Sequence, residues 1–179
     1  MDHNQLYEDA EHHNCVFVGY DGDKPRHAFQ RSTLSSSTFM GDVPGSDKRF
    51  SFAVPKKAST KTLCVFECAI DALSYLTMLK TRGQDWQKAN TLSLSGVYGP
   101  KRNGEMRLPL ALDQYLKDNS QIDTLILCLD NDDTGHRASR AIQRLLTGYT
   151  VRHNPPVGAK DYNELLQQEM GWVATPSSE

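Results

Sequence analysis

Three segments of the sequence place carboxylates where strands or loops of a predicted sheet end. Glu67 closes one apolar segment, Asp130 and Asp132 close another, and Asp161 follows a loop near the C-terminus. Because the carboxyl ends of parallel strands share one edge of a sheet, we expect these acids to meet there. Clustered carboxylates repel one another unless a cation or shifted protonation relieves the repulsion, and Mg²⁺ and Mn²⁺ prefer oxygen ligands. The sequence therefore predicts a site for Mg²⁺ (or Mn²⁺) at this edge.

Some nearby acids have a second interpretation. Asp71 lies in the first turn of the helix predicted after Glu67, and Asp133 precedes the next predicted helix. The helix dipole favours carboxylates at such positions whether or not they bind a ligand. We count Asp71 among the candidate metal ligands and expect Asp133 to be a cap or a surface acid. Thr134 is the expected N-cap, and Gly135 a flexible joint before the helix.

Basic residues cluster at two places that could contact phosphate groups. One is a glycine-containing loop at the expected catalytic edge, and the other is a helix whose arginines recur at spacings of three and four. Local clusters bind backbone phosphates even in a slightly acidic protein, although an arginine stripe on a helix is usually a solvated face. The candidate nucleic-acid-binding residues are Lys101, Arg102 and Arg107 of the loop, Arg137 of the helix, and, apart from both clusters, Lys160 beside Asp161.

The elements that must position these residues follow from the hydrophobic pattern. From residue 61 onwards, short apolar segments alternate with segments of helical periodicity, which indicates a parallel sheet with helices on both faces. The predicted strands are 63–66, 91–95, 125–129 and 149–152, and the predicted helices are 69–80, 109–117, 137–146 and 162–170.

The front third of the chain has a different pattern, typical of a small antiparallel β segment. Its predicted strands are 16–20, 26–31 and 49–54, with a loop over 32–44 and a polar tail or frayed helix over 1–14. We therefore predict an N-terminal β segment over 1–58, an α/β domain over 59–172 and a flexible tail over 173–179.

Composition narrows the class of protein. The formal net charge of −2 gives no global sign of nucleic-acid affinity, so such a partner would have to meet a local basic patch. No apolar run approaches the roughly 20 residues of a membrane span, and the N-terminus has no signal-peptide core. The four cysteines show neither Cys-x-x-Cys nor zinc-like spacing, so we expect buried structural thiols. A cytoplasmic protein without a membrane partner is expected.

Four motifs occur in a familiar order. They are ECAIDA at 67–72, SLSG at 93–96, DND at 130–132 and KDYNEL at 160–165. Together they resemble the Toprim domain, the catalytic α/β module of bacterial primases, type IA and type II topoisomerases and OLD-type nucleases. The resemblance covers about residues 61–170. The segment before it resembles the region that precedes Toprim in primase-like proteins of plasmids and conjugative elements.

The resemblance implies a role for each acid. Glu67 matches the motif glutamate, a general acid/base in cleaving members and a metal ligand or its neighbour in primases. Asp130 and Asp132 match the pair that holds Mg²⁺, and Asp71 and Asp161 match acids of primase-type members. Cys68 is a departure, since many members carry glycine at this position.

The implied function is Mg²⁺-dependent chemistry on nucleic-acid phosphodiesters, with primase-type nucleotidyl transfer in the replication or transfer of a mobile element as the first hypothesis. Its partners would be DNA or RNA, nucleotides, and other domains or a helicase or relaxase of the parent protein. A Toprim nuclease and a non-catalytic nucleic-acid-binding module remain as alternatives. The pattern at Asp130, Asp132 and Thr134 also resembles the first motif of haloacid-dehalogenase-type phosphatases, but that assignment leaves Glu67 unexplained.

Overall fold

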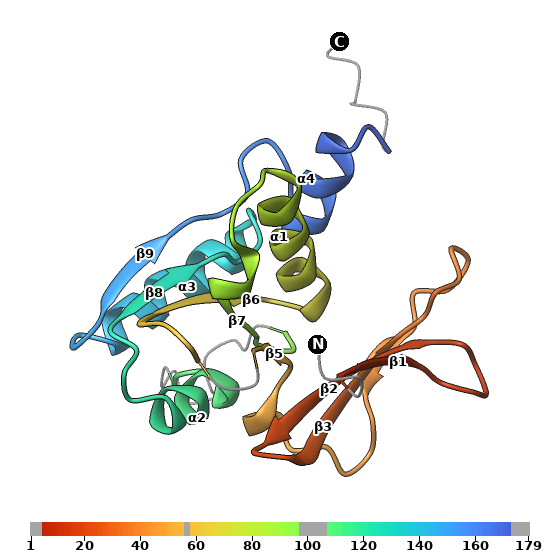
Figure 1. Cartoon of the computed structure of the whole chain (residues 1–179), viewed down its shortest axis with the longest axis horizontal. Coiled ribbons are helices and arrows are strands. Elements are labelled where there is room, and N and C mark those ends of the chain that lie inside the picture. Colours follow the sequence, from red (N-terminus) through yellow and green to blue (C-terminus); the bar gives the residue numbers. More distant parts are fainter. Residues whose placement is uncertain (1–4, 56–57, 97–106, 173–179) are drawn as a thin grey trace.

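The computed structural model describes residues 5–55, 58–96 and 107–172. It contains two sheets, which Figure 1 shows as an antiparallel N-terminal sheet (red to orange) beside a larger sheet flanked by helices. No helix in the described ranges is long and apolar enough to cross a membrane.

The larger sheet carries the α/β pattern that the sequence predicts. Its strand order is β5-β7-β6-β8-β9, and every neighbouring pair is parallel except β5 with β7. The strands are β5 (Ala53–Val54), β6 (Thr62–Phe66), β7 (Asn90–Ser93), β8 (Thr124–Leu127) and β9 (Thr150–His153). The predicted fold class is confirmed.

Helices cover both faces of this sheet. On β6, Leu63 and Val65 join the core under α2 and α3, whereas Cys64 and Phe66 point to the opposite face, under α1 and α4. Burial on both faces explains why this strand is apolar without alternation. The helices are α1 (Ala69–Thr81), α2 (Leu110–Asp118), α3 (Asp133–Leu145) and α4 (Tyr162–Glu169), with α1 and α4 side by side in Figure 1.

The N-terminal sheet differs from the prediction in its membership. Its order is β1-β2-β3-β4, all antiparallel. Residues in the predicted tail and in the predicted 32–44 loop form two of its strands, because their backbones complete ladders with β2 and β3. These strands are β1 (Leu6–Glu8), β2 (Cys15–Asp21), β3 (Lys24–Arg31) and β4 (Met40–Asp42).

The predicted strand over 49–54 is wrong in its first half and misplaced in its second. The side chain of Asp47 accepts a hydrogen bond from the Arg49 N–H and so caps a short 3-10 helix, η1 (Lys48–Phe50). The chain then enters β5, which pairs with β7 of the other sheet. Alternating residues predict a strand but do not say which sheet it joins.

The two sheets pack together through a small aromatic core. Phe17 of the N-terminal sheet meets Phe52 edge to face, with ring centroids 5.7 Å apart, and both contact Ala69 at the start of α1. On the same strand as Phe17, Gly19 lies directly against the backbone of η1, where an added Cβ would come within 1.7 Å of the Phe50 carbonyl oxygen. This close approach brings the N-terminal sheet against the α/β sheet.

The Gly19 contact predicts a stability effect. Gly19→Ala should lower the free energy of unfolding by about 1–3 kcal/mol, since the backbone of η1 must move away from the new methyl group. Gly41→Ala in β4, where an added Cβ meets open space, should change it by less than about 0.5 kcal/mol. Denaturant titration of both variants measures this difference, and equal effects would contradict the packing described.

Candidate metal centre and cleft

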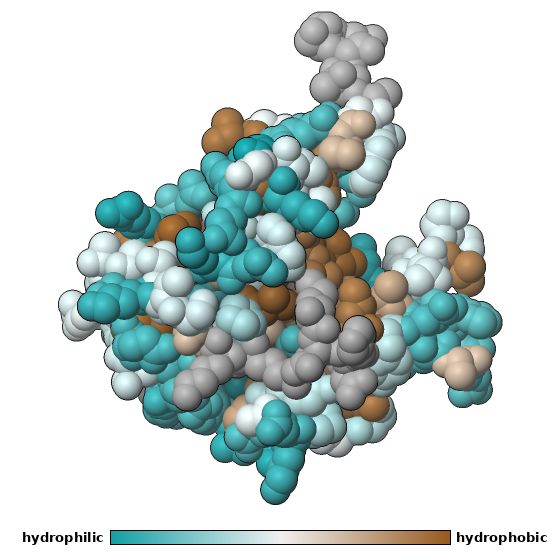
Figure 2. All heavy atoms as spheres, viewed as in Figure 1, coloured by the Kyte–Doolittle hydropathy of each residue, from teal (hydrophilic) through white to brown (hydrophobic). Residues whose placement is uncertain are grey.

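A cleft of about 620 Å³ lies where the N-terminal sheet meets the carboxyl ends of the parallel strands. Four of the predicted acids line it: Glu67, Asp71, Asp130 and Asp161. Asp132, the fifth, is not among the lining residues. Figure 2 shows hydrophobic side chains (brown) gathered in the hollow between the end of α1 and the N-terminal sheet, in the same part of the molecule.

Glu67 directly follows β6, and Asp130 lies just beyond the end of β8, which is Leu127. The backbone N–H of Asp130 donates to Oε1 of Glu67 across 3.3 Å. Burial, followed by the negative charge of Asp130, raises the pKa of Glu67 to about 7. Burial, followed by the charges of Asp71 and Asp161, raises the pKa of Asp130 to about 6. These two carboxyl groups therefore keep their protons to a higher pH than ordinary carboxyl groups do, and Glu67 titrates close to neutral pH.

Asp71 is buried and already committed to hydrogen bonds. Its Oδ1 accepts from the N–H of Asn163, 3.1 Å away in α4, and its Oδ2 accepts from the Cys68 thiol at 2.9 Å. Burial raises the pKa of Asp71, and the hydrogen bonds from Cys68 and Asn163, followed by the charge of Arg31, oppose that rise. Cys68 has an extended backbone, with φ of −133°, so glycine is not required where the resemblance leads one to expect it.

Asp132 and Asp161 cap helices. Oδ1 of Asp132 accepts from the N–H groups of Thr134 and Gly135, each at 2.9 Å, and Oδ1 of Asp161 accepts from the Glu164 N–H at 2.7 Å. Such caps satisfy backbone donors that the first turn of a helix leaves free.

The expected start of α3 was wrong. Asp132, not Thr134, is the N-cap, and Gly135 lies inside the helix. An added Cβ at Gly135 would come within 2.1 Å of the Asp130 carbonyl oxygen, so glycine lets the helix start against the tip of β8. Asp133 is an exposed acid of the first turn, as expected.

Asn131, which the sequence reasoning did not single out, joins two parts of the cleft. Its N–H donates to the Lys160 carbonyl oxygen at 2.7 Å, and its side-chain amide reaches the Ala159 carbonyl oxygen at 3.4 Å. These bonds hold the loop before α4 beside Asp130. An asparagine between two acids gives no sequence signal of this role.

The predicted basic residues are dispersed. Lys160 is exposed and lines the cleft, and exposed Arg137 donates to the Thr134 hydroxyl. Arg107 is exposed but is not among the lining residues, and Lys101 and Arg102 lie outside the described residues. The sequence reasoning missed Arg31 and Lys48 of the N-terminal region, which also line the cleft. Only the packing of one sheet on the other shows that they face the carboxylates.

The chemistry of the acids fits a divalent cation, although no described group of three or more His, Cys, Asp or Glu side chains is arranged as a metal site. Asp71, Asp132 and Asp161 already accept backbone or thiol hydrogen bonds. Glu67 and Asp130 have carboxylate oxygens whose mutual repulsion a cation would relieve. These two are the residues that would hold Mg²⁺ or Mn²⁺.

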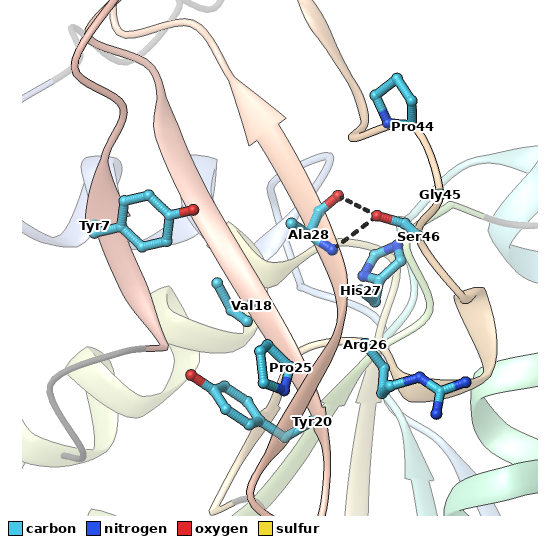
Figure 3. Close-up of a pocket in the computed structure, with 10 residues that line it drawn as sticks. All are labelled: Tyr7, Val18, Tyr20, Pro25, Arg26, His27, Ala28, Pro44, Gly45 and Ser46. Atoms are coloured by element: carbon cyan, nitrogen blue, oxygen red, sulfur yellow. Dashed lines mark hydrogen bonds between the residues drawn. The ribbon is translucent and has the colours of Figure 1, made fainter.

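A second cavity, of about 490 Å³, lies on the N-terminal sheet (Figure 3). Val18 and Ala28 contribute to it, together with Tyr7 and Tyr20, and the Ser46 hydroxyl hydrogen-bonds the backbone of Ala28 at its edge. Among the described residues that line it there is no carboxylate. The acidic chemistry therefore belongs to the cleft between the sheets.

Comparison with known proteins agrees with this geometry. Residues 64–166 match the family model described as Toprim-like. The chain belongs to the Toprim-like family. Residues 1–58 match a second model, described as a protein of unknown function (DUF3991). No curated protein matches the chain.

The Toprim-like chain is similar in fold to solved primase structures. The primase fragment of the bacteriophage T7 primase-helicase matches with a TM-score of 0.64 and 15% identity, over 93% of this chain and 62% of that one. The E. coli primase catalytic core matches with a TM-score of 0.57 and 15% identity, and the match covers 92% of this chain and 53% of that one. The Aquifex aeolicus primase, with its zinc-binding and RNA polymerase domains, matches with a TM-score of 0.56 and 16% identity, and the match covers 93% of this chain and 41% of that one. The chain thus spans about two fifths to three fifths of these structures.

The raised pKa of Glu67 predicts a pH-dependent effect on stability. A carboxyl group whose pKa is 4.5 in the unfolded chain and about 7 in the folded chain destabilises the fold as pH rises through this interval. Glu67→Gln removes that effect, so it should raise the free energy of unfolding by about 1–2 kcal/mol at about pH 8, after allowance for solvent screening.

The gain should disappear at about pH 4, where Glu67 is protonated in both states. Thermal or denaturant unfolding in metal-free buffer with a chelator measures it. The same gain at both pH values would mean that ionisation of Glu67 is not the cause.

Proposed function

We propose that this chain performs Mg²⁺- or Mn²⁺-dependent chemistry on nucleic-acid phosphodiesters, most closely primase-type nucleotidyl transfer. The observation that carries the proposal is the pair of half-buried carboxylates at adjacent strand tips, Glu67 and Asp130, in a cleft large enough for a nucleotide. The Toprim-like family and the fold of the primase structures support it.

Each residue has a role that follows from its environment. A divalent ion held by Glu67 and Asp130 would supply charge neutralisation for a phosphodiester. Glu67, with a pKa of about 7, can give or take a proton near neutral pH, which is the property of an efficient general acid or base. Lys160 brings a positive charge close to Asp130, whose pKa it lowers against the larger effects of burial and neighbouring acids.

Three acids position the site. Asp71 joins α1 to α4, while Asp132 and Asp161 fix the starts of α3 and α4. In the proposed function, Asp71, Asp132 and Asp161 act first as positioning residues. Both oxygens of Asp71 accept hydrogen bonds, whereas the cap bonds of Asp132 and Asp161 use Oδ1 and leave Oδ2 available to a ligand.

The wider assignment is also a proposal. Residues 1–58 would form an N-terminal segment, 59–172 the catalytic Toprim domain and 173–179 a tail. The parent protein would act in replication or transfer of a mobile element, with DNA or RNA, nucleotides and a helicase or relaxase as partners. The primase-helicase of bacteriophage T7, whose primase fragment shares the fold, supports the helicase connection.

Nuclease activity is the second candidate. It is favoured by Glu67, because a carboxyl group with a pKa of about 7 can protonate a leaving oxygen. Primer synthesis from nucleotides on a single-stranded template supports the primase assignment, whereas shortening of a labelled strand supports the nuclease.

Removal of one carboxylate tests the metal centre. In the wild type, Mg²⁺ or Mn²⁺ should raise the melting temperature, because an ion that binds only the folded chain stabilises it. Asp130→Asn should abolish that rise and reduce turnover at least about 100-fold, since the ion loses half of its anionic ligands.

Asp133→Asn is the matched control, because Asp133 is an exposed acid three residues along the chain. It should respond to metal as the wild type does. Thermal shift with and without metal, followed by the two activity assays, gives the comparison. An equal response in the wild type, Asp130→Asn and Asp133→Asn would contradict the proposed centre.

A further inference from the structure

The edge of the N-terminal sheet forms the wall of the cleft opposite the carboxylates. In the β3–β4 ladder, Arg31 pairs directly with Met40, and Phe29 pairs with Asp42. Directly paired residues project from the same face of a sheet, and all four line the cleft. The sheet therefore presents one face, of mixed apolar and charged character, to the acidic site.

Two apolar side chains at this wall of the cleft are exposed, one in β4 and one just before it. Met40 is 61% exposed and the preceding residue, Phe39, is 51% exposed, and both line the cleft. Phe17 and Phe29, by contrast, pack in the core that joins the sheet to α1. Exposed apolar side chains are ordinary when scattered, so the position of these two beside the carboxylates is the informative feature.

The same face carries an exposed cation, Arg31. Within the part of the chain that the structure describes, its guanidinium makes no side-chain hydrogen bond or ion pair, although its charge lowers the pKa of Asp71 across the cleft. The acid on this face, Asp42, is already paired with Lys48 at 2.6 Å and with His27 at 2.9 Å. On the opposite side of the cleft, Lys160 adds a second positive charge. An anion that enters the cleft thus has a positive charge on each side, in addition to the carboxylates that the proposed metal ion would neutralise.

We propose that Phe39, Met40 and Arg31 form a contact site for single-stranded nucleic acid, in which a base lies on Phe39 and Met40 and an adjacent phosphate binds Arg31. The proposal rests on the proposed function and extends it by giving the N-terminal region its own part in substrate binding. An unpaired strand is the occupant that fits, because only unpaired bases expose a face that can stack on an aromatic ring. A duplex offers its phosphates but keeps its base faces covered.

The site is a binding site and not a second catalytic centre. Stacking on an aromatic side chain tolerates any base, so the contact would hold a strand without reading its sequence. The guanidinium of Arg31 would add an attraction that salt weakens. The carboxylates of the cleft would then face the backbone of a strand held from the other side.

Two variants and two matched controls test the contact. Phe39→Ala removes the stacking surface, and Leu34→Ala removes a side chain that is 62% exposed in the same β3–β4 connection but does not line the cleft. Arg31→Ala removes the cation, and Lys24→Ala removes an exposed cation at the other end of β3. The probe is a fluorescein-labelled thymidine strand of about 12 nucleotides, within the usual range of single-strand sites.

Fluorescence anisotropy should show a Kd about tenfold weaker for Phe39→Ala. Arg31→Ala should weaken binding and reduce the slope of log K against log salt by about 0.7, the value for one phosphate contact on a single strand. Leu34→Ala and Lys24→Ala should stay within about twofold of the wild type. A duplex of the same length should bind more weakly than the single strand and should be insensitive to Phe39→Ala.

Two results would overturn the proposal: a Kd unchanged in both test variants, or a wild type that binds no single strand. A metal-dependent thermal shift on the same proteins separates this failure from that of the proposed function. If Mg²⁺ stabilises every variant while Phe39→Ala and Arg31→Ala bind normally, the strand contact alone is wrong. If Mg²⁺ fails to stabilise the wild type, the metal centre is wrong.

Discussion

The contact between Glu67 and Asp130 is the constraint on which the rest of the site depends. Glu67 directly follows β6 and Asp130 lies just beyond β8. Burial, followed by the charge of Asp130, raises the pKa of Glu67 to about 7, and burial, followed by the charges of Asp71 and Asp161, raises the pKa of Asp130 to about 6. One backbone N–H, that of Asp130, stabilises the charged form of Glu67. For the fold alone this arrangement is unfavourable, because two buried like charges destabilise the native state. A divalent cation held by Glu67 and Asp130 would offset this repulsion, and the proposed function follows from that difference.

The structure around this pair is fixed by carboxylates that have another use. Asp132 and Asp161 cap α3 and α4, and Asp71 ties α1 to α4 through the Asn163 N–H. Asn131 joins the tip of β8 to the loop that carries Lys160. Asp71, Asp132 and Asp161 thus hold the starts and the packing of the helices, while Glu67 and Asp130 face each other at the sheet edge. The N-terminal sheet closes the cleft by packing Phe17 against Phe52, a contact that the close approach at Gly19 permits.

The sequence predicted the α/β sheet and the meeting of Glu67 with Asp130, because apolar runs buried on both faces mark parallel strands and their ends share an edge. It could not separate a helix cap from a metal ligand at Asp132 or Asp161, since both roles place an aspartate between a strand or loop and a helix. The sequence suggested that Gly135 is a flexible joint. The reason for glycine at this position is its close approach to the Asp130 carbonyl oxygen, which is visible only in the folded chain. The partner of β5 and the orientation of Arg31 depended equally on the packing of one sheet against the other.

The most direct test of the central claim is the number of protons released when a metal ion binds. Isothermal titration with Mg²⁺ or Mn²⁺ at about pH 6.5, in buffers of different ionisation enthalpy, counts them. With pKa values of about 7 for Glu67 and about 6 for Asp130, the free pair holds about one proton at this pH, and binding should release it. Release should fall towards zero at about pH 8.5, where both groups are already ionised. Binding without proton release at about pH 6.5, or no binding at all, would contradict a metal centre built on these two carboxylates.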